Sequence, residues 1–169
     1  MLQQRMDKLE SLVRDGERRS RMNNIDIKGV PVTQSENLFQ IFAKLGDHIK
    51  CTIPKENINY VARIPMRHDK VNKTIIVSVH NRYQKEDFVA AAKNFTIIPT
   101  DLKLPGVNRI FINDHLTLED KLLLNKAKTL AKEKYFEFTW VKGCKIYARK
   151  SPTSHVITIK SEADLKKLV

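Results

Sequence analysis

The sequence predicts an α+β protein in three parts, and three observations support this fold class. Residues 1–16 carry apolar side chains at a helical spacing, residues 24–104 alternate strand-like and helix-like patterns, and Pro105-Gly106 interrupts the chain before a second set of short elements. Apolar residues make up 41% of the 169 residues, which is enough for a hydrophobic core and excludes a disordered chain.

The first part, residues 1–16, has the pattern of a coiled coil. Its seam would consist of Leu2, Met6, Leu9 and Val13, spaced by 4, 3 and 4 residues. Two heptads are too short to be stable alone, so we expect the end of a longer coiled coil through which the chain self-associates. The alternative is a single amphipathic helix packed on its own domain. Gly16 ends the periodicity, and residues 17–23 are predicted to be a basic connector.

The second part, residues 24–104, is predicted to contain six elements. They are a strand at 24–28, a helix over 35–49, strands at 57–64 and 73–79, a helix over 83–95 and a last strand within 96–102. This order, βαββαβ, is that of ferredoxin-like folds, which include the RNA-recognition module (RRM). The order alone is weak evidence of function, because this fold serves many functions.

The third part, residues 105–169, is predicted to be a small α+β domain. A short strand at 109–113 precedes a helix over 117–134, and the acids at its start fit a helix N-terminus. Strands at 136–141, 144–149 and 155–160 would then form a three-stranded antiparallel sheet before a last helix from residue 161.

Positive charge is spread over all three parts. Lys and Arg number 31 against 19 Asp and Glu, a net charge of +12, and residues 105–169 contribute 13 basic and 7 acidic residues. This excess favours a polyanionic partner, with nucleic acid preferred over a membrane surface. No apolar run is long enough for a membrane span or resembles a signal peptide, so we expect an intracellular protein, cytoplasmic and/or nuclear.

The predicted central strands of the second part, 24–28 and 73–79, contain no Phe, Tyr or Trp. Base stacking on that sheet is therefore not expected, and nucleic acid would be held through its phosphates. The candidate phosphate ligands flank the first and second strands and are Arg18, Arg19, Arg21, Arg63 and Arg67. Each could equally be a solvated surface charge.

Aromatic and basic residues interleave in the third part. Phe136, Phe138 and Trp140 alternate along one strand, and the pattern favours a core role for their face over a binding surface. Tyr147 with Arg149 is the better candidate for stacking and phosphate contact. The remaining basic candidates are in the hairpin and on one stripe of the helix, where they could also be only solvated: Lys145, Lys150, Lys121 and Lys128.

The sequence contains no recognisable catalytic motif. No glycine-rich phosphate loop is present, the five histidines are scattered, and Cys51 and Cys144 have neither zinc-site nor disulfide-framework spacing. We therefore expect no catalytic residues, no metal and no cofactor.

Four stretches resemble two known families. The run from Arg18 to Pro31 resembles the entry to the RNA-binding domain of LINE-type retrotransposon first-open-reading-frame proteins. Residues 110–117, 121–124 and 147–150 resemble the C-terminal domain of the baculoviral few-polyhedra protein and its insect relatives.

The resemblance implies a coiled coil, an atypical RRM-like domain and a C-terminal domain that cooperate to bind single-stranded nucleic acid as a chaperone, often as trimers. The family's nucleic-acid-binding positions match the arginines already named, and also Trp140 and Lys145. It departs at Asn125 and Lys126, where the retroelement family has an arginine pair, and at Val32, where an acid is usual.

The sequence thus predicts a non-enzymatic, oligomeric protein that binds single-stranded RNA or DNA, with RNA preferred. Phosphates would lie in a groove between the second and third parts. The alternative is an interaction adaptor whose coiled coil and C-terminal domain bind partner proteins, with no direct contact to nucleic acid.

Overall fold

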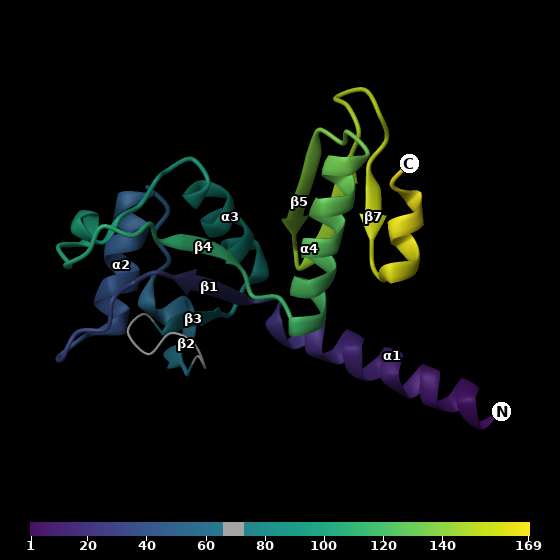
Figure 1. Cartoon of the computed structure of the whole chain (residues 1–169). Coiled ribbons are helices and arrows are strands. Elements are labelled where there is room, and N and C mark those ends of the chain that lie inside the picture. Colours follow the sequence, from purple (N-terminus) through teal and green to yellow (C-terminus); the bar gives the residue numbers. More distant parts are fainter. Residues whose placement is uncertain (66–72) are drawn as a thin grey trace. The chain divides into compact units, whose positions relative to one another are not determined.

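The computed structural model describes residues 1–65 and 73–169, which form two compact units (Figure 1). The central unit comprises Asn23–His115, and the terminal unit combines Met1–Met22 with Leu116–Val169. The central unit is therefore a continuous insertion between the two segments of the terminal unit. The sequence placed the second domain boundary at 104/105, whereas the structure keeps residues up to His115 in the central unit.

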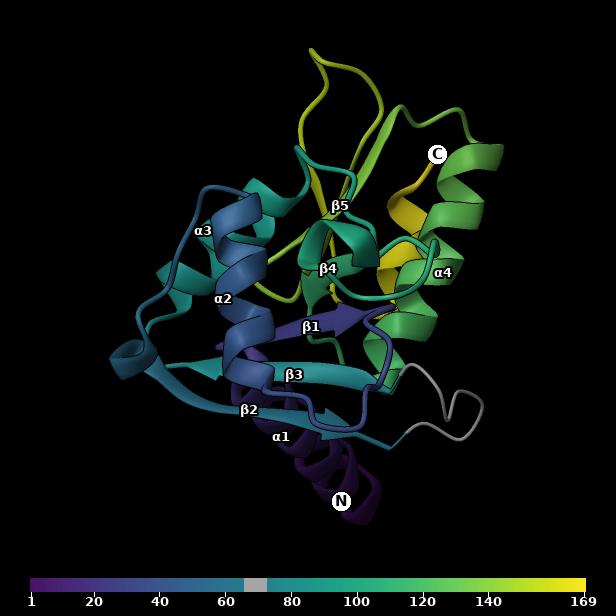
Figure 2. The ribbon, with the colours of Figure 1, turned by 90° about the vertical axis from the view of Figure 1, so that its left-hand side faces the viewer.

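The central unit has the predicted βαββαβ order. Its elements are β1 (Asn24–Lys28), α2 (Leu38–His48), β2 (Ile58–Ile64), β3 (Thr74–Val79), α3 (Arg82–Ala92) and β4 (Phe111–Asp114). The strands form an antiparallel sheet in the order β2-β3-β1-β4, so β1 and β3 are central as expected. Both helices pack on one face of this sheet (Figure 2).

The prediction of the last strand was wrong. Residues 96–102 contribute only an isolated bridge, between Ile97 and Ile110, and the 3₁₀ helix η2 (Pro99–Leu102). The fourth strand is β4, which pairs with β1 so that Asp114 lies opposite Ile25. Local pattern identified a strand near 109–113 but not its partner, because strand pairing over so long a separation leaves no local signal.

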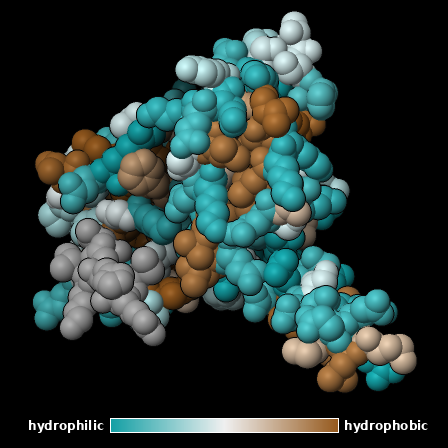
Figure 3. All heavy atoms as spheres, turned by 45° about the vertical axis from the view of Figure 1, so that its right-hand side comes forward, coloured by the Kyte–Doolittle hydropathy of each residue, from teal (hydrophilic) through white to brown (hydrophobic). Residues whose placement is uncertain are grey.

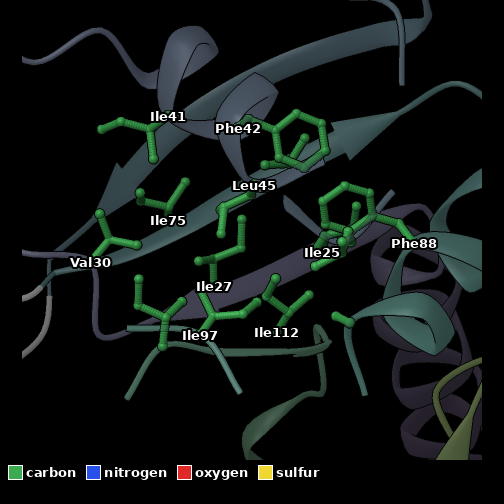
Figure 4. Packing of buried hydrophobic residues seen from close by; sticks show 14 of the residues in the cluster. Ile25, Ile27, Val30, Ile41, Phe42, Leu45, Ile75, Phe88, Ile97 and Ile112 are labelled. Atoms are coloured by element: carbon green, nitrogen blue, oxygen red, sulfur yellow. The ribbon is translucent and has the colours of Figure 1, made fainter. Parts of the chain in front are cut away.

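The core of the central unit lies between the helices and the sheet (Figure 4). Ile25 and Ile27 of β1 are at most 1% exposed and meet Phe42 of α2 and Phe88 of α3. The two phenyl rings lie 4.7 Å apart in a tilted arrangement. Burial of such side chains contributes about 25 cal/mol per Å² of apolar surface removed from water, and it determines which face of each helix points inward.

One ion pair lies inside the central unit. The Lys85 side chain of α3 is fully buried, and its Nζ lies 2.8 Å from the carboxylate of Asp114 in β4. A buried charge is stable only with a partner, so this contact links α3 to the edge strand.

The terminal unit contains the predicted three-stranded antiparallel sheet. Its elements are α1 (Leu2–Arg21), α4 (Leu118–Glu133), β5 (Phe138–Lys142), β6 (Lys145–Arg149), β7 (Ile157–Ile159) and the 3₁₀ helix η3 (Glu162–Lys167). Thr117 begins α4 by accepting a hydrogen bond from the amide of Asp120. The core between α4 and the sheet contains Leu123, Ala127, Ile146, Ala148 and Ile159.

The first helix is longer than predicted. α1 continues through Gly16 to Arg21, so most of the expected connector 17–23 is helical. A glycine inside a helix costs only about 1 kcal/mol, which contacts of the last turns outweigh. Leu2, Met6, Leu9 and Val13 are 75%, 50%, 62% and 61% exposed. The alternative that this face packs on its own domain is therefore wrong, and Figure 3 shows apolar side chains among hydrophilic ones on α1.

Candidate nucleic-acid interface

The sheet of the terminal unit has an outer face that turns away from its core. In β6, Ile146 and Ala148 are buried under α4, so the alternate residues Lys145, Tyr147 and Arg149 face outward. In the β5–β6 register Trp140 lies opposite Tyr147, Phe138 opposite Arg149, and Lys142 opposite Lys145. Thr158 of β7 continues the central row. This outer face therefore carries three aromatic rings and three basic side chains.

Trp140 and Tyr147 form a stacked pair at the centre of this face. Their ring centroids are 5.6 Å apart and their planes differ by 23°. Phe138 is 39% exposed beside them. The expected core role is wrong for Phe138 and Trp140, which lie outside the core, whereas Phe136 precedes β5 and packs against it. Periodicity correctly placed Phe138 and Trp140 on one face but wrongly grouped Phe136 with them, and it could not show which side of the strand the helix covers.

The cations of the outer face differ in how far they are engaged. Lys142 and Lys145 are exposed at the β5–β6 turn. Arg149 donates from Nε to the carbonyl of Ser154 at 2.8 Å and from its guanidinium to the carbonyl of Pro152, which closes the following loop. Lys150 donates to the carbonyl of Val169 and lies 5.6 Å from the ring of Phe136. Lys142 and Lys145 are thus more available to a phosphate than Arg149 and Lys150.

Arg18 is engaged within the terminal unit. Its guanidinium holds both carboxylate oxygens of Asp120, at 2.7–3.1 Å, and donates to the carbonyl of Lys160 at 2.8 Å. The Asp120 side chain is only 3% exposed. The hydrogen bonds that Arg18 donates to the Asp120 carboxylate raise the pKa of Arg18 above its usual value. This arginine joins α1 to α4 and has little capacity left for a phosphate.

The other two connector arginines make fewer internal hydrogen bonds than Arg18. Arg21 donates to the carbonyl of Leu116 at 2.9 Å. Arg19 is exposed and makes one long contact, 3.4 Å from Nε to the carbonyl of Asp15. Arg18, Arg19 and Lys145, which are far apart in sequence, line one cavity of about 420 Å³ in the terminal unit.

Arg63 also has structural partners. It makes five hydrogen bonds in the central unit, to both carboxylate oxygens of Glu36 and to the carbonyls of Val30, Pro31 and Lys73. Its side chain is 11% exposed. The hydrogen bond from Arg63 lowers the pKa of Glu36 below its usual range. Arg67, the other arginine predicted beside the second strand, lies outside the described residues.

The α4 lysines and the cysteines complete the predicted set. Lys121 is half-buried near the start of α4, and Lys128 is exposed. Cys51 and Cys144 are not joined by a disulfide, and burial raises the pKa of the Cys51 thiol. Across residues 1–65 and 73–169, no group of three His, Cys, Asp or Glu side chains is placed to hold a metal ion. None of the helices in this described part is long and apolar enough to cross a bilayer.

Sequence reasoning missed aromatic rings at the edges of the central sheet. Tyr60 of β2 is 45% exposed, and Phe111 of β4 is 47% exposed with the guanidinium of Arg109 5.0 Å from its ring centre. The central strands lack aromatics as predicted, but Phe111 was assigned to the next domain. The Arg-x-Phe spacing in a strand was the available signal, because it places both side chains on the same face.

Of two comparisons with known proteins, one bears on the terminal unit. A search of curated proteins finds none that matches the chain. A family model does match, over the stretch that contains α4, β5–β7 and η3. Residues 117–169 are similar to the family described as Baculovirus FP protein domain 2.

Proposed function

We propose that the chain binds single-stranded RNA or DNA through the outer face of its β5–β6–β7 sheet. The observation that carries the proposal is the stacked Trp140–Tyr147 pair, flanked on the same face by Phe138 and by Lys142 and Lys145. Aromatic rings bind bases through their faces regardless of base identity, and neighbouring cations attract the backbone. We therefore expect weak sequence preference and no chemical turnover.

Phosphate contacts come from the cations that are not engaged inside the protein. Lys142, Lys145 and Arg19 are exposed, whereas Arg18 and Arg63 spend their hydrogen bonds on carboxylates and carbonyls of their own unit. The phosphate-binding set that we propose is therefore smaller than the one expected from sequence, and its members belong to the terminal unit. Arg21, Arg149, Lys150, Lys121 and Lys128 are secondary contributors at its margins.

Self-association would strengthen such binding. The seam of α1 is exposed along four residues at heptad spacing. When several copies associate, each additional contact with a long strand becomes intramolecular, and avidity can exceed single-site affinity by about 10²–10⁴. We infer an intracellular protein, cytoplasmic and/or nuclear, with chaperone-like activity. We also infer a relation to LINE-type first-open-reading-frame proteins, which the order of helix, βαββαβ unit and C-terminal sheet supports.

The test is a titration of a labelled single-stranded oligonucleotide at several salt concentrations. Log affinity should fall linearly with log salt, with a slope of about −0.7 per phosphate contact. The double variant Lys142→Gln/Lys145→Gln should make the slope of log affinity against log salt shallower by about 1.4, because two phosphate contacts are removed. Affinity that does not change with salt, or a slope unchanged in the double variant, contradicts the proposal.

A second candidate function rests on a different observation. Leu118 and Leu122, one turn apart on α4, are 72% and 54% exposed, and such a pair suits contact with a partner protein. An adaptor of this kind needs no nucleic acid. Absence of oligonucleotide binding at low salt, by a protein that is folded, would favour it over the nucleic-acid proposal.

A further inference from the structure

The cavity of about 420 Å³ in the terminal unit is built by three segments. α1 contributes Asp15, Arg18 and Arg19, Met22 follows at its C-terminal end, and Asp120 lies in the first turn of α4. The third segment is the sheet. Its β5–β6 turn supplies Gly143 and Cys144, the start of β6 supplies Lys145 and Ile146, and Ile159 and Lys160 lie at and just after the end of β7. The volume is in the range of about 300–1,000 Å³ that is typical of small-molecule sites.

Direct contacts hold these segments together around the cavity. The Sγ of Cys144 lies 3.8 Å from the carbonyl of Arg21 at the end of α1. Arg18 reaches the carbonyl of Lys160 at 2.8 Å. Gly143 and Cys144 both have φ near +60°, as a tight two-residue hairpin turn requires. The left-handed conformation is unfavourable for cysteine, and such conformations concentrate at binding sites.

The charges around the cavity are not balanced. Arg18 and Asp120 neutralise each other, and Asp15 lies 3.9 Å from Arg18. Among the described residues, no acidic oxygen lies within 4.0 Å of the side-chain nitrogens of Arg19, Lys145 or Lys160. Three cations, from α1, from β6 and from the residue that follows β7, thus border one cavity without an acidic partner, which is the arrangement that attracts an anion.

Part of the cavity lining is apolar. Met22, Ile146, Ile159 and Cys144 line it together with the charged side chains. A simple anion such as a lone phosphate would gain nothing from these side chains, whereas a planar ring would be removed from water against them. The ligand that fits both parts is amphipathic, with an anionic group and a flat apolar portion.

We propose that this cavity binds one nucleotide unit, with the phosphate at Arg19, Lys145 and Lys160 and the base over Met22. The inference rests on the proposed function, because the unit is taken to belong to a nucleic-acid strand. Lys145 also lies at the turn end of the outer face, so it is shared between that face and the cavity. The cavity then adds a nucleotide-sized subsite to a surface that otherwise only stacks bases.

The test uses the full chain and adenosine monophosphate, with adenosine as the probe that lacks the phosphate. In amide NMR spectra, adenosine monophosphate should shift Gly143, Lys145 and Lys160, and adenosine should shift them far less. The Arg19→Gln/Lys160→Gln variant should weaken the nucleotide about tenfold. Lys93→Gln/Lys166→Gln removes two exposed charges elsewhere and should leave affinity unchanged. Equal shifts from the two probes, or unchanged affinity in the cavity variant, would overturn the inference.

A short oligonucleotide without terminal phosphates separates the two sources of the phosphate. If it shifts the same three amides, the cavity takes an internal phosphate of a strand; if only the mononucleotide does, the cavity takes a terminal or free nucleotide. If the chain binds the oligonucleotide but neither probe shifts these three amides, the cavity is not a nucleotide site, and the proposed function is unaffected. If adenosine monophosphate shifts these amides more than adenosine does but the oligonucleotide does not bind, the cavity is a nucleotide site and the proposed function is contradicted.

Discussion

The guanidinium of Arg18 and the carboxylate of Asp120 make a two-point contact across 102 residues of sequence. Arg18 belongs to the last turns of α1 and Asp120 to the first turn of α4. One turn earlier in α1, Arg14 lies 2.8 Å from Glu119, so two successive arginines meet two successive acids. These pairs anchor the helix that carries the exposed seam to the unit that carries the stacked aromatic rings.

Removing Arg18 should destabilise the terminal unit more than removing its neighbour. Arg18→Ala leaves the Asp120 carboxylate buried without its cation, and we expect the free energy of unfolding to fall by about 2 kcal/mol. Arg19→Ala removes an exposed charge and should cost at most about 0.5 kcal/mol. Urea unfolding followed by the fluorescence of Trp140, the single tryptophan, measures both. Equal losses in the two variants would contradict the assigned role of Arg18.

The central unit should lose stability in acid through Glu36. Its pKa in the folded chain lies below the ordinary 4.5 because Arg63 donates to the carboxylate. The stabilisation is therefore complete above about pH 4.5, the unfolded value, and is lost as pH falls through the folded pKa. Glu36→Gln should be less stable than the native chain at pH 7, and the difference should shrink towards pH 3.

Urea unfolding by circular dichroism across this pH range measures the Glu36 effect. Glu56→Gln, at an exposed position in the 3₁₀ helix η1 (Lys55–Asn57), is the matched control and should keep the native pH profile. A constant difference between Glu36→Gln and the native chain from pH 7 to pH 3 would show that the ion pair with Arg63 does not stabilise the fold.

Tyr147 should contribute to nucleic-acid affinity through its ring. Tyr147→Leu removes one stacking surface, worth about 1–3 kcal/mol per base, so affinity should fall about 5- to 150-fold. Tyr147→Phe keeps the ring and should bind within about twofold of the native chain. Tyr135→Leu, at an 88% exposed position outside the sheet, is the control.

Fluorescence polarisation with a labelled oligonucleotide measures these affinities, and quenching of Trp140 on binding reports contact at the stacked pair. If Tyr147→Phe loses as much affinity as Tyr147→Leu, the ring does not stack on a base. If the native chain binds without any change in Trp140 fluorescence, the outer face of the sheet is not the interface.

The α1 seam should control self-association. Leu9 is 62% exposed at the middle of the seam, and Leu9→Asp places a charge where a partner helix would need an apolar side chain. Light scattering after size exclusion should give a multiple of the chain mass for the native protein and a single-chain mass for the variant. Ser11→Asp, off the seam, should keep the native mass. A native protein of single-chain mass refutes the assignment.

Local pattern predicted most elements of the fold. The heptad spacing gave a helix, alternation gave the strands, and the order of elements gave the βαββαβ unit and the three-stranded sheet. The failures have separate physical causes. Gly16 was interpreted as a helix end although its cost is small, and Phe111 was assigned to the wrong unit because β4 pairs with β1 across the whole βαββα stretch.

The sequence by itself determined the class of this protein: an α+β chain with excess positive charge, an apolar seam on its first helix, and aromatic and basic residues alternating in a C-terminal hairpin. Only the tertiary structure decided which of those charges are available. Arg18 and Arg63 look like any other arginine in sequence, but their guanidinium groups are held by Asp120 and Glu36. A charge is available to a ligand only if no internal partner holds it, and that depends on residues brought together by folding.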